Sequence, residues 1–329
     1  MKTTRKGFID VQFNGWMGTD FTAPGLTLAR VREITLELLS RGTLAYCPTV
    51  ITGDPEVYKD NLRVLAEAMK DPEIGPHLLG IHLEGPFLSP EPGAVGAHPK
   101  AYIQDPDVRA FEQYQQWAGG GIRILTLAPE RPHAEALIRV AVKNNVIVSL
   151  GHHLAADAEL DRAVQAGATL CTHVGNGCPN LIHRHDNALW WQLASDAVSG
   201  LFITDGHHLP DDLIKVALRA KTPARFIVTS DASCLAGMPP GRYTVFCGLP
   251  VIISETGRIY SEQSQSLAGS HATMMECMNY LASLNLLDEK GLWQVGYDNP
   301  ARLLNLDPKR LAALKGPEVR FEDSRFVLA

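Results

Sequence analysis

Short apolar runs recur along the whole chain, and they constrain its fold more than any other feature. Eight of them are almost continuously hydrophobic, and segments with helical spacing separate them. Continuous rather than alternating hydrophobicity is typical of parallel strands that are buried on both faces. The eight candidate strands lie at 7–13, 43–49, 77–84, 122–128, 146–152, 168–174, 199–206 and 225–231.

The segments between these runs have the pattern of amphipathic helices. In TLARVREITLELLSRG, for example, Leu28, Val31, Ile34 and Leu38 share one face, and Gly42 follows as a stop. Eight strand–helix units in one chain predict an α/β protein with a (β/α)8 barrel of the TIM type. The 329 residues are compatible with this fold, because such barrels typically have about 250 residues and grow by insertion.

The chain continues beyond the eighth predicted strand. Two alternating apolar runs around a Gly-Leu-Pro turn predict a β-hairpin insertion at 243–260. We therefore expect a catalytic barrel over 1–307 that includes this hairpin. Residues 308–329 form a charged, weakly patterned C-terminal tail.

Charge and hydropathy restrict the partners of the protein. The formal net charge is −6, and the chain has no run of Lys or Arg, which argues against nucleic acid or an anionic membrane as the main partner. The sequence has no apolar signal region and no stretch of roughly 18 apolar residues. We expect a cytoplasmic protein with a small-molecule substrate.

Residues suited to metal binding and acid–base chemistry stand where the predicted strands end. In a (β/α)8 barrel these ends converge on one mouth, where the chemistry takes place. A single histidine at a strand end is usually structural, but several such groups at the same end of different strands are hard to explain by coincidence. One Glu and two His are a standard ligand set for a catalytic zinc-type ion, with a fourth position left for water, and a nearby Asp is a candidate general base. The residues at these ends are Glu84, His152, His173, His207, His208 and Asp231.

Motifs around these residues resemble those of the N-acetylglucosamine-6-phosphate deacetylases of the amidohydrolase superfamily. They cover residues 7 to about 306 in the order of that family, and they include GFIDVQFNG, GIHLEGPFL with GAHP, TLAPE, SLGHH, THVGN, ITDGHH, VTSDAS, SLAGS and NPARLL. The resemblance implies a metal-dependent (β/α)8 barrel, which in this family usually carries a small β-domain built from both chain ends. It also implies hydrolysis of the acetamide of N-acetylglucosamine-6-phosphate, or of a close N-acetylhexosamine phosphate.

The resemblance assigns roles residue by residue. Glu84, His152 and His173 correspond to the metal ligands, and Asp231 corresponds to the catalytic acid/base. His208 corresponds to a histidine that contacts the substrate and polarises the amide carbonyl. Further substrate contacts are implied for His98, Asn176, Gly177 and Arg184, the last of these as the phosphate-binding arginine.

Several positions depart from the pattern of the family. Gln12 and Asn14 stand where many amidohydrolases have two histidines that bind a second metal, so we expect one divalent ion per chain, Zn²⁺ first and Fe²⁺, Mn²⁺ or Co²⁺ as alternatives. The segments NGC (176–178) and HDN (185–187) replace the usual N-A-M and E-P-G, which leaves the exact sugar open.

The chain ends depart from the family as well. Only six residues precede Gly7, and the tail lacks the usual Gly- and Asp-containing strands, so we expect the small β-domain to be reduced or absent, with 308–329 as its remnant. The 243–260 hairpin would then be the only sizeable β-structure outside the barrel. Its exposed edge needs a cover, and either a partner subunit or the charged tail would provide one. We expect a homodimer or a higher homo-oligomer.

Two other readings remain open at this point. A related amidohydrolase could deacylate an unphosphorylated N-acyl sugar or an N-acyl amino acid, and a substrate panel separates this activity from the first. A catalytically silent sugar-binding or regulatory barrel is the alternative from another class. An assay of acetate release distinguishes that barrel from both enzymes.

Overall fold

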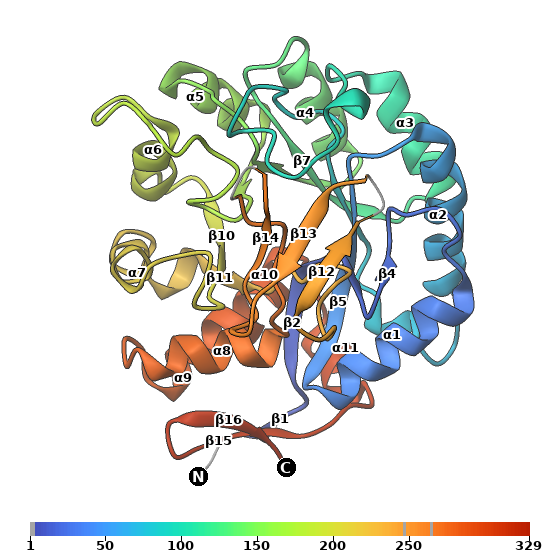
Figure 1. Ribbon diagram of the computed structural model, residues 1–329, viewed down its shortest axis with the longest axis vertical. Helices are drawn as coiled ribbons and strands as arrows, with labels where there is room; N and C mark the ends of the chain where they lie inside the picture. Colours follow the sequence, from blue (N-terminus) through green and yellow to red (C-terminus); the bar gives the residue numbers. More distant parts are fainter. Residues whose placement is uncertain (1–3, 246–247, 264–265) are drawn as a thin grey trace.

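The computed structural model describes residues 4–245, 248–263 and 266–329, and its centre is a sheet of eight parallel strands (Figure 1). The strands follow one another around the sheet in chain order, and each predicted apolar run overlaps one of them. They are β2 (Phe8–Phe13), β5 (Thr43–Ile51), β6 (Ile81–Glu84), β7 (Ile122–Leu127), β8 (Ile147–Leu150), β9 (Leu170–Cys171), β10 (Ser199–Ile203) and β11 (Phe226–Thr229).

The first and last of these strands meet and close the sheet into a barrel. A parallel bridge joins Phe13 to Ala232, and the backbone N–H of Asp231 donates to the carbonyl of Gln12 at 3.0 Å. This closure confirms the predicted (β/α)8 fold. It also brings the C-terminal end of β2 beside that of β11.

A helix follows each barrel strand and packs on the outside of the barrel (Figure 1). The first of them begins where the Thr27 side chain accepts the Arg30 N–H, and its Val31, Ile34 and Leu38 are buried in the main core. Within the described ranges, no helix is long and apolar enough to cross a membrane. The eight helices are α1 (Leu28–Ser40), α2 (Pro55–Ala68), α3 (Val108–Trp117), α4 (Ala134–Lys143), α5 (Asp157–Ala166), α6 (Ala188–Ala194), α7 (Asp211–Arg225) and α8 (Met274–Ser283).

The insertion after β11 has three strands, so the prediction of a two-stranded hairpin at 243–260 is wrong in strand number. The antiparallel strands are β12 (Gly241–Thr244), β13 (Pro250–Ile253) and β14 (Ile259–Ser261). The chain turns twice because Ser254 donates its N–H to the Arg258 carbonyl, which folds β14 back onto β13. Ile259 of β14 then packs with Val251 and Ile253. Residues 246 and 247 lie outside the described part of the chain.

Both chain ends contribute to a second small sheet, whereas the sequence predicts at most a remnant of such a structure in 308–329 and no other sizeable β-structure outside the barrel than the 243–260 hairpin. Strand β1 (Thr4–Arg5) pairs with β15 (Val319–Glu322), which pairs with β16 (Arg325–Leu328), and this sheet lies with both termini at the bottom of Figure 1. Asp323 and Ser324 both have positive φ (48° and 63°), as in the type I′ turns that favour hairpins. The alternation in VRFE-DS-RFVL is the sequence signal for this hairpin, and it is short.

The remaining elements either lie in loops of the barrel or lead from α8 to this terminal sheet. Phe8 of β2 stacks on Trp293 with ring centroids 5.0 Å apart, and Phe326 of β16 packs edge-on against both rings. The tail therefore closes the barrel floor instead of extending away from it. These elements are β3 (Gly15–Trp16), β4 (Thr19–Asp20), η1 (Gly75–His77), η2 (Lys100–Tyr102), α9 (Glu289–Trp293), η3 (Gln294–Asp298), α10 (Asn299–Leu303) and α11 (Pro308–Ala313).

Candidate active site

A cavity of ≈ 550 Å³ lies at the C-terminal ends of the barrel strands. This volume is in the range of small-molecule sites, which are typically about 300–1,000 Å³. The cavity brings together all but one of the site residues predicted from the sequence. They are Glu84, His98, His152, His173, Asn176, Gly177, His208 and Asp231.

Three of these residues have an unusual backbone conformation. His152, His173 and Asp231 each stand two residues after a barrel strand, with φ of 53°, 27° and 49°. Non-glycine residues rarely adopt positive φ, and such strain concentrates at functional sites. These local turns direct three side chains from three different strands toward one point.

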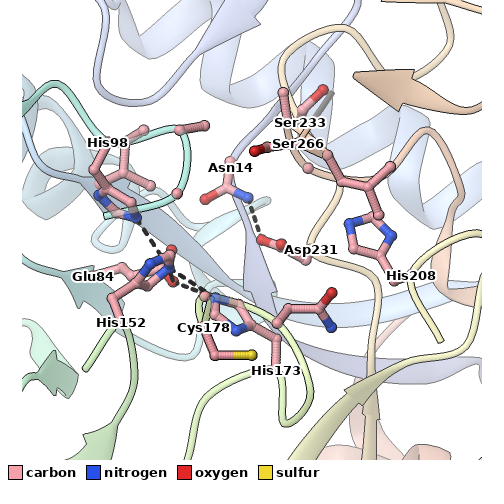
Figure 2. A pocket seen from close by; sticks show the side chains of 18 of the residues that line it. Asn14, Glu84, His98, His152, His173, Cys178, His208, Asp231, Ser233 and Ser266 are labelled. Atoms are coloured by element: carbon pink, nitrogen blue, oxygen red, sulfur yellow. Dashed lines mark hydrogen bonds and ion pairs between the residues drawn. The ribbon is translucent and has the colours of Figure 1, made fainter. Parts of the chain in front are cut away.

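The side chains of Glu84, His152 and His173 meet closely at that point (Figure 2). Glu84 Oε1 lies 3.0 Å from His173 Nε2 and 3.2 Å from His152 Nε2, and the two Nε2 atoms are 3.0 Å apart. Ligand atoms about 2.0–2.1 Å from a tetrahedral zinc-type ion are about 3.3 Å from each other. The three atoms therefore have nearly the spacing that a single ion requires.

Protonation at this cluster also suits a metal ion. The Nδ1 of His152 lies 2.7 Å from the carbonyl of Ala94, so it carries the proton and leaves Nε2 free as a ligand. Burial alone raises the pKa of Glu84, but its contacts with His152 and His173 outweigh burial and hold this pKa well below its ordinary value. An ionised carboxylate and the free Nε2 of His152 fit a divalent ion.

His98 lies beside this cluster and forms a second group with Glu84 and His152 that is compact enough to hold an ion. Its Nε2 is 3.2 Å from His152 Nε2. The Thr52 N–H, however, donates to His98 Nδ1 at 3.4 Å, and burial lowers the pKa of His98 to about 3. A neutral ring that accepts at Nδ1 carries its proton on Nε2, which can then donate to a substrate but cannot ligate a metal.

Asp231 is held on one side by two amide groups from the end of β2, of which Figure 2 shows that of Asn14. Its Oδ1 accepts from Gln12 Nε2 at 2.9 Å and from Asn14 Nδ2 at 2.7 Å. Burial and the neighbouring charge of Glu84 raise the pKa of Asp231 to about 7. A carboxyl group with such a pKa is suited to acid–base chemistry near neutral pH. In the sequence, Gln12 and Asn14 stand out only as poor metal ligands. Their hydrogen bonds to Asp231 are not predicted.

Asp205 is a further residue that the sequence analysis misses. Its Oδ2 accepts from His208 Nδ1 at 2.8 Å, and its Oδ1 accepts the backbone N–H groups of His207 and His208 at 2.9 Å each. Burial would raise the pKa of Asp205, but the hydrogen bond from His208 holds it far below its ordinary value. Asp205 therefore fixes the orientation of the His208 ring through Nδ1 and leaves Nε2 free to face the cavity. The sequence signal for this contact is the spacing of Asp205, two residues before His207 and three before His208, which is typical of an Asx turn.

Arg184 is the predicted site residue that the structure does not bring to the cavity. It lies on the exposed loop after β9, where its carbonyl accepts the indole N–H of Trp190 at 2.9 Å. On the same loop the side chain of Leu181 is 93% exposed. Another arginine, Arg258 of the insertion, does line the cavity. No pattern in the sequence indicates this, because it depends on how the insertion folds over the barrel mouth.

The barrel and its site define a class of protein. A (β/α)8 barrel with a Glu-His-His cluster that could hold a metal ion, and a buried Asp with a raised pKa at the same mouth, has the architecture of the metal-dependent amidohydrolases.

Comparisons with known proteins are more specific. No family model matches the chain. It is 33% identical over 313 residues to N-acetylglucosamine-6-phosphate deacetylase from Bos taurus, covering 92% of this chain and 75% of that protein. It is 31% identical over 315 residues to the Bacillus subtilis deacetylase of the same name, covering 95% and 78%. An N-acetylgalactosamine-6-phosphate deacetylase from Shewanella is 34% identical over 281 residues, covering 85% and 69%.

Solved structures agree with these relatives. The N-acetyl-D-glucosamine-6-phosphate deacetylase from Mycobacterium smegmatis superposes with a TM-score of 0.88 at 26% identity, covering 100% of this chain and 85% of that one. A mutant of that enzyme, solved in complex with N-acetyl-D-glucosamine-6-phosphate, also has a TM-score of 0.88. The chain belongs to the N-acetylglucosamine-6-phosphate deacetylase family.

Proposed function

We propose that this protein hydrolyses the acetamide of N-acetylglucosamine-6-phosphate to acetate and glucosamine-6-phosphate. The observation that carries the proposal is the Glu84–His152–His173 cluster beside Asp231 in a cavity large enough for a sugar. The relatives named above act on this substrate or its epimer by name.

We assign one divalent ion, Zn²⁺ first, to Glu84, His152 and His173. When bound, such an ion supplies Lewis-acid chemistry, because it lowers the pKa of a water molecule and polarises a carbonyl group. Nitrogen and carboxylate ligands in this number are typical of catalytic zinc sites. Gln12 and Asn14 direct their amide N–H groups at Asp231, which supports a single ion per chain.

The residues of the chain then divide the proton transfers between them. Asp231 accepts a proton from the water molecule whose oxygen bonds to the acetyl carbon. His208 donates a hydrogen bond from Nε2 to the carbonyl oxygen as negative charge develops there. Asp231 returns the proton to the amine nitrogen as the C–N bond breaks, so acetate and the free amino sugar leave.

Further residues of the cavity are proposed to bind the sugar. His98 can donate from Nε2, and the amide nitrogen of Asn176 is buried with no hydrogen-bond partner among the described residues. Gly177 has a φ of 61°, and a Cβ there would lie 3.0 Å from the His152 ring, so only glycine leaves the cluster undisturbed. Arg184 stays a proposed phosphate contact that would have to reach the cavity from outside its lining.

A second candidate substrate is the C4 epimer, N-acetylgalactosamine-6-phosphate. The observation that favours it is the 34% identity to the Shewanella deacetylase that is named for this sugar. The two sugars differ only in the orientation of the hydroxyl group at C4, so overall sequence identity does not decide which of them is the substrate. The altered NGC and HDN segments lie on the same loop as the proposed sugar contacts.

The experiment that tests this proposal is a panel of acetate-release assays. The metal-loaded protein is given N-acetylglucosamine-6-phosphate, N-acetylgalactosamine-6-phosphate and both unphosphorylated sugars. We expect the highest kcat/KM with N-acetylglucosamine-6-phosphate. A preference for an unphosphorylated sugar would support the related amidohydrolase instead, and no acetate from any sugar would support a catalytically silent barrel.

We also propose a cytoplasmic location and a homo-oligomer. A sugar phosphate is charged and does not cross membranes unaided, so an enzyme that uses it belongs in the compartment where it is made. Exposed apolar side chains on the loop after β9 and on α6 support self-association: Leu181, Ile182 and Trp190 are 93%, 43% and 52% exposed.

A further inference from the structure

The cavity contains more negative than positive side chains for an anionic substrate. Asp20, Glu84 and Asp231 line it, and Arg258 is the only Lys or Arg among the described residues that do so. A phosphate group entering this cavity is repelled by carboxylates and needs a cation in addition to any metal. The position and the partners of Arg258 therefore decide where a phosphate can bind.

Arg258 stands on the turn that leads into β14, and this turn is fixed to the barrel. The Arg258 N–H donates to Ser254 Oγ at 3.0 Å, and Ser254 donates its own N–H to the Arg258 carbonyl at 2.9 Å. On the same turn, the carbonyl of Thr256 accepts from His207 Nε2 at 2.9 Å. His207 adjoins His208, so the turn is attached directly beside the proposed catalytic histidine.

The guanidinium group of Arg258 is oriented, and it has no ion pair with any residue that the structure describes. Its Cζ lies 5.1 Å from the centroid of the Tyr260 ring, a cation–π contact that favours one direction of the side chain. Within 4–245, 248–263 and 266–329, no carboxylate oxygen is within 4.0 Å of its nitrogens. Arg242 of the same sheet, in contrast, pairs with Glu262 at 2.8 Å and does not line the cavity.

We propose that Arg258 forms an anion subsite at the rim of the active-site cavity and binds the phosphate of the sugar substrate. This inference rests on the proposed function and adds a residue that determines specificity. A guanidinium group binds phosphate through two parallel hydrogen bonds, which the ammonium group of Lys cannot reproduce. Because Arg184 lies outside the cavity, Arg258 is the cation that a single chain offers within its described lining.

The test compares Arg258→Gln and Arg258→Lys with wild type, using N-acetylglucosamine with and without its 6-phosphate. The matched control is Arg242→Gln, which removes an arginine from the same sheet. For Arg258→Gln we expect KM for the phosphorylated sugar to rise at least tenfold with a smaller change in kcat, and KM for the unphosphorylated sugar to stay unchanged. Arg258→Lys should recover only part of the loss. Arg242→Gln should behave like wild type.

Two results overturn the inference. One is a KM change in Arg258→Gln that is absent or equal for both sugars. The other is an Arg184→Gln variant that carries the whole phosphate-dependent effect while Arg258→Gln has none.

A second measurement separates this inference from the proposed function. If wild type releases no acetate, the proposed function fails, but calorimetric binding of glucosamine-6-phosphate still tests Arg258. A sugar phosphate is the probe because inorganic phosphate can bind a metal ion directly. Arg258→Gln should weaken this binding at least tenfold and leave that of glucosamine unchanged. Equal binding by wild type and variant contradicts the subsite.

Discussion

Asn14 Nδ2 donates a hydrogen bond of 2.7 Å to Asp231 Oδ1, and this contact joins the end of the first barrel strand to the end of the last (Figure 2). Closure of the barrel between β2 and β11 makes it possible. Gln12 adds a second donor to the same oxygen at 2.9 Å. The two amides thus fix the carboxyl group through Oδ1 and leave Oδ2 to transfer the proton.

Replacing Asn14 should slow catalysis without removing the metal. Asn14→Leu keeps the branching of the side chain at Cγ but removes a hydrogen bond to a charged acceptor, which is worth about 1.5–3 kcal/mol. We expect kcat for acetate release to fall roughly 10- to 100-fold, with KM and metal content close to those of wild type. An unchanged kcat would show that the amide does not position Asp231.

Asp231→Asn should abolish nearly all turnover and leave folding and bound metal intact. Asparagine has the same shape but cannot accept the proton from water. The measurement pairs acetate release with elemental analysis of the purified variant. If the variant loses its metal, Asp231 is a ligand and the role assigned to it is wrong.

Asp205 should act on catalysis through His208, because its carboxylate holds the ring by Nδ1 and so directs Nε2 at the substrate carbonyl oxygen. For Asp205→Asn we expect kcat to fall about tenfold or more, with KM little changed, because an amide is a weaker acceptor for Nδ1 than a carboxylate. Asp211→Asn is the control, since Asp211 accepts a hydrogen bond from the exposed Tyr280 hydroxyl at 2.6 Å. A lower kcat in Asp205→Asn that is accompanied by a higher KM and a lower melting temperature would indicate a structural role only.

The sequence predicts the residues that strand position determines, and it misses those that tertiary contacts determine. Glu84, His152, His173 and Asp231 each follow an apolar strand, and parallel strands in a barrel all end at one mouth. The roles of Gln12 and Asn14 depend on which strands close the barrel, and that of Arg258 depends on how an insertion folds over the mouth. No local pattern encodes such contacts between distant segments.

The errors in the fold have a similar cause. Strands of two to four residues, such as β1, β15 and β16, have too few positions for alternation to stand out. The pairing of β1 with β15 also joins residues that lie more than 300 positions apart, for example Thr4 with Arg320. A motif can also mislead about position. The motif around Arg184 predicts that this residue lies in the cavity, whereas the structure places it on an exposed loop.

The free energy of unfolding should fall on mild acidification because of His82. This residue is fully buried inside the barrel, and its Nε2 lies 2.7 Å from Thr126 Oγ1. Burial lowers the pKa of His82 to about 4, whereas an unfolded histidine titrates near about 6.5. Between these values the unfolded chain takes up a proton that the folded chain does not. The resulting stability is complete above about pH 6.5 and is lost as the pH falls toward 4, by about 2 kcal/mol at pH 5.

His82→Gln removes this titration, so its free energy of unfolding in urea should change less than that of wild type between pH 7 and pH 5. The comparison of the two proteins cancels any loss of metal that both undergo. Equal pH dependence in the two proteins would contradict this prediction.

Titration of the metal-stripped protein with Zn²⁺, with acetate release as the readout, is the most direct test of the metal site. It shows whether one metal ion at Glu84, His152 and His173 supports hydrolysis of N-acetylglucosamine-6-phosphate. We expect no activity at the start and a linear rise that saturates at about one equivalent per chain. Full activity in the metal-stripped protein, saturation only at two equivalents, or no acetate release at any zinc concentration would contradict the claim.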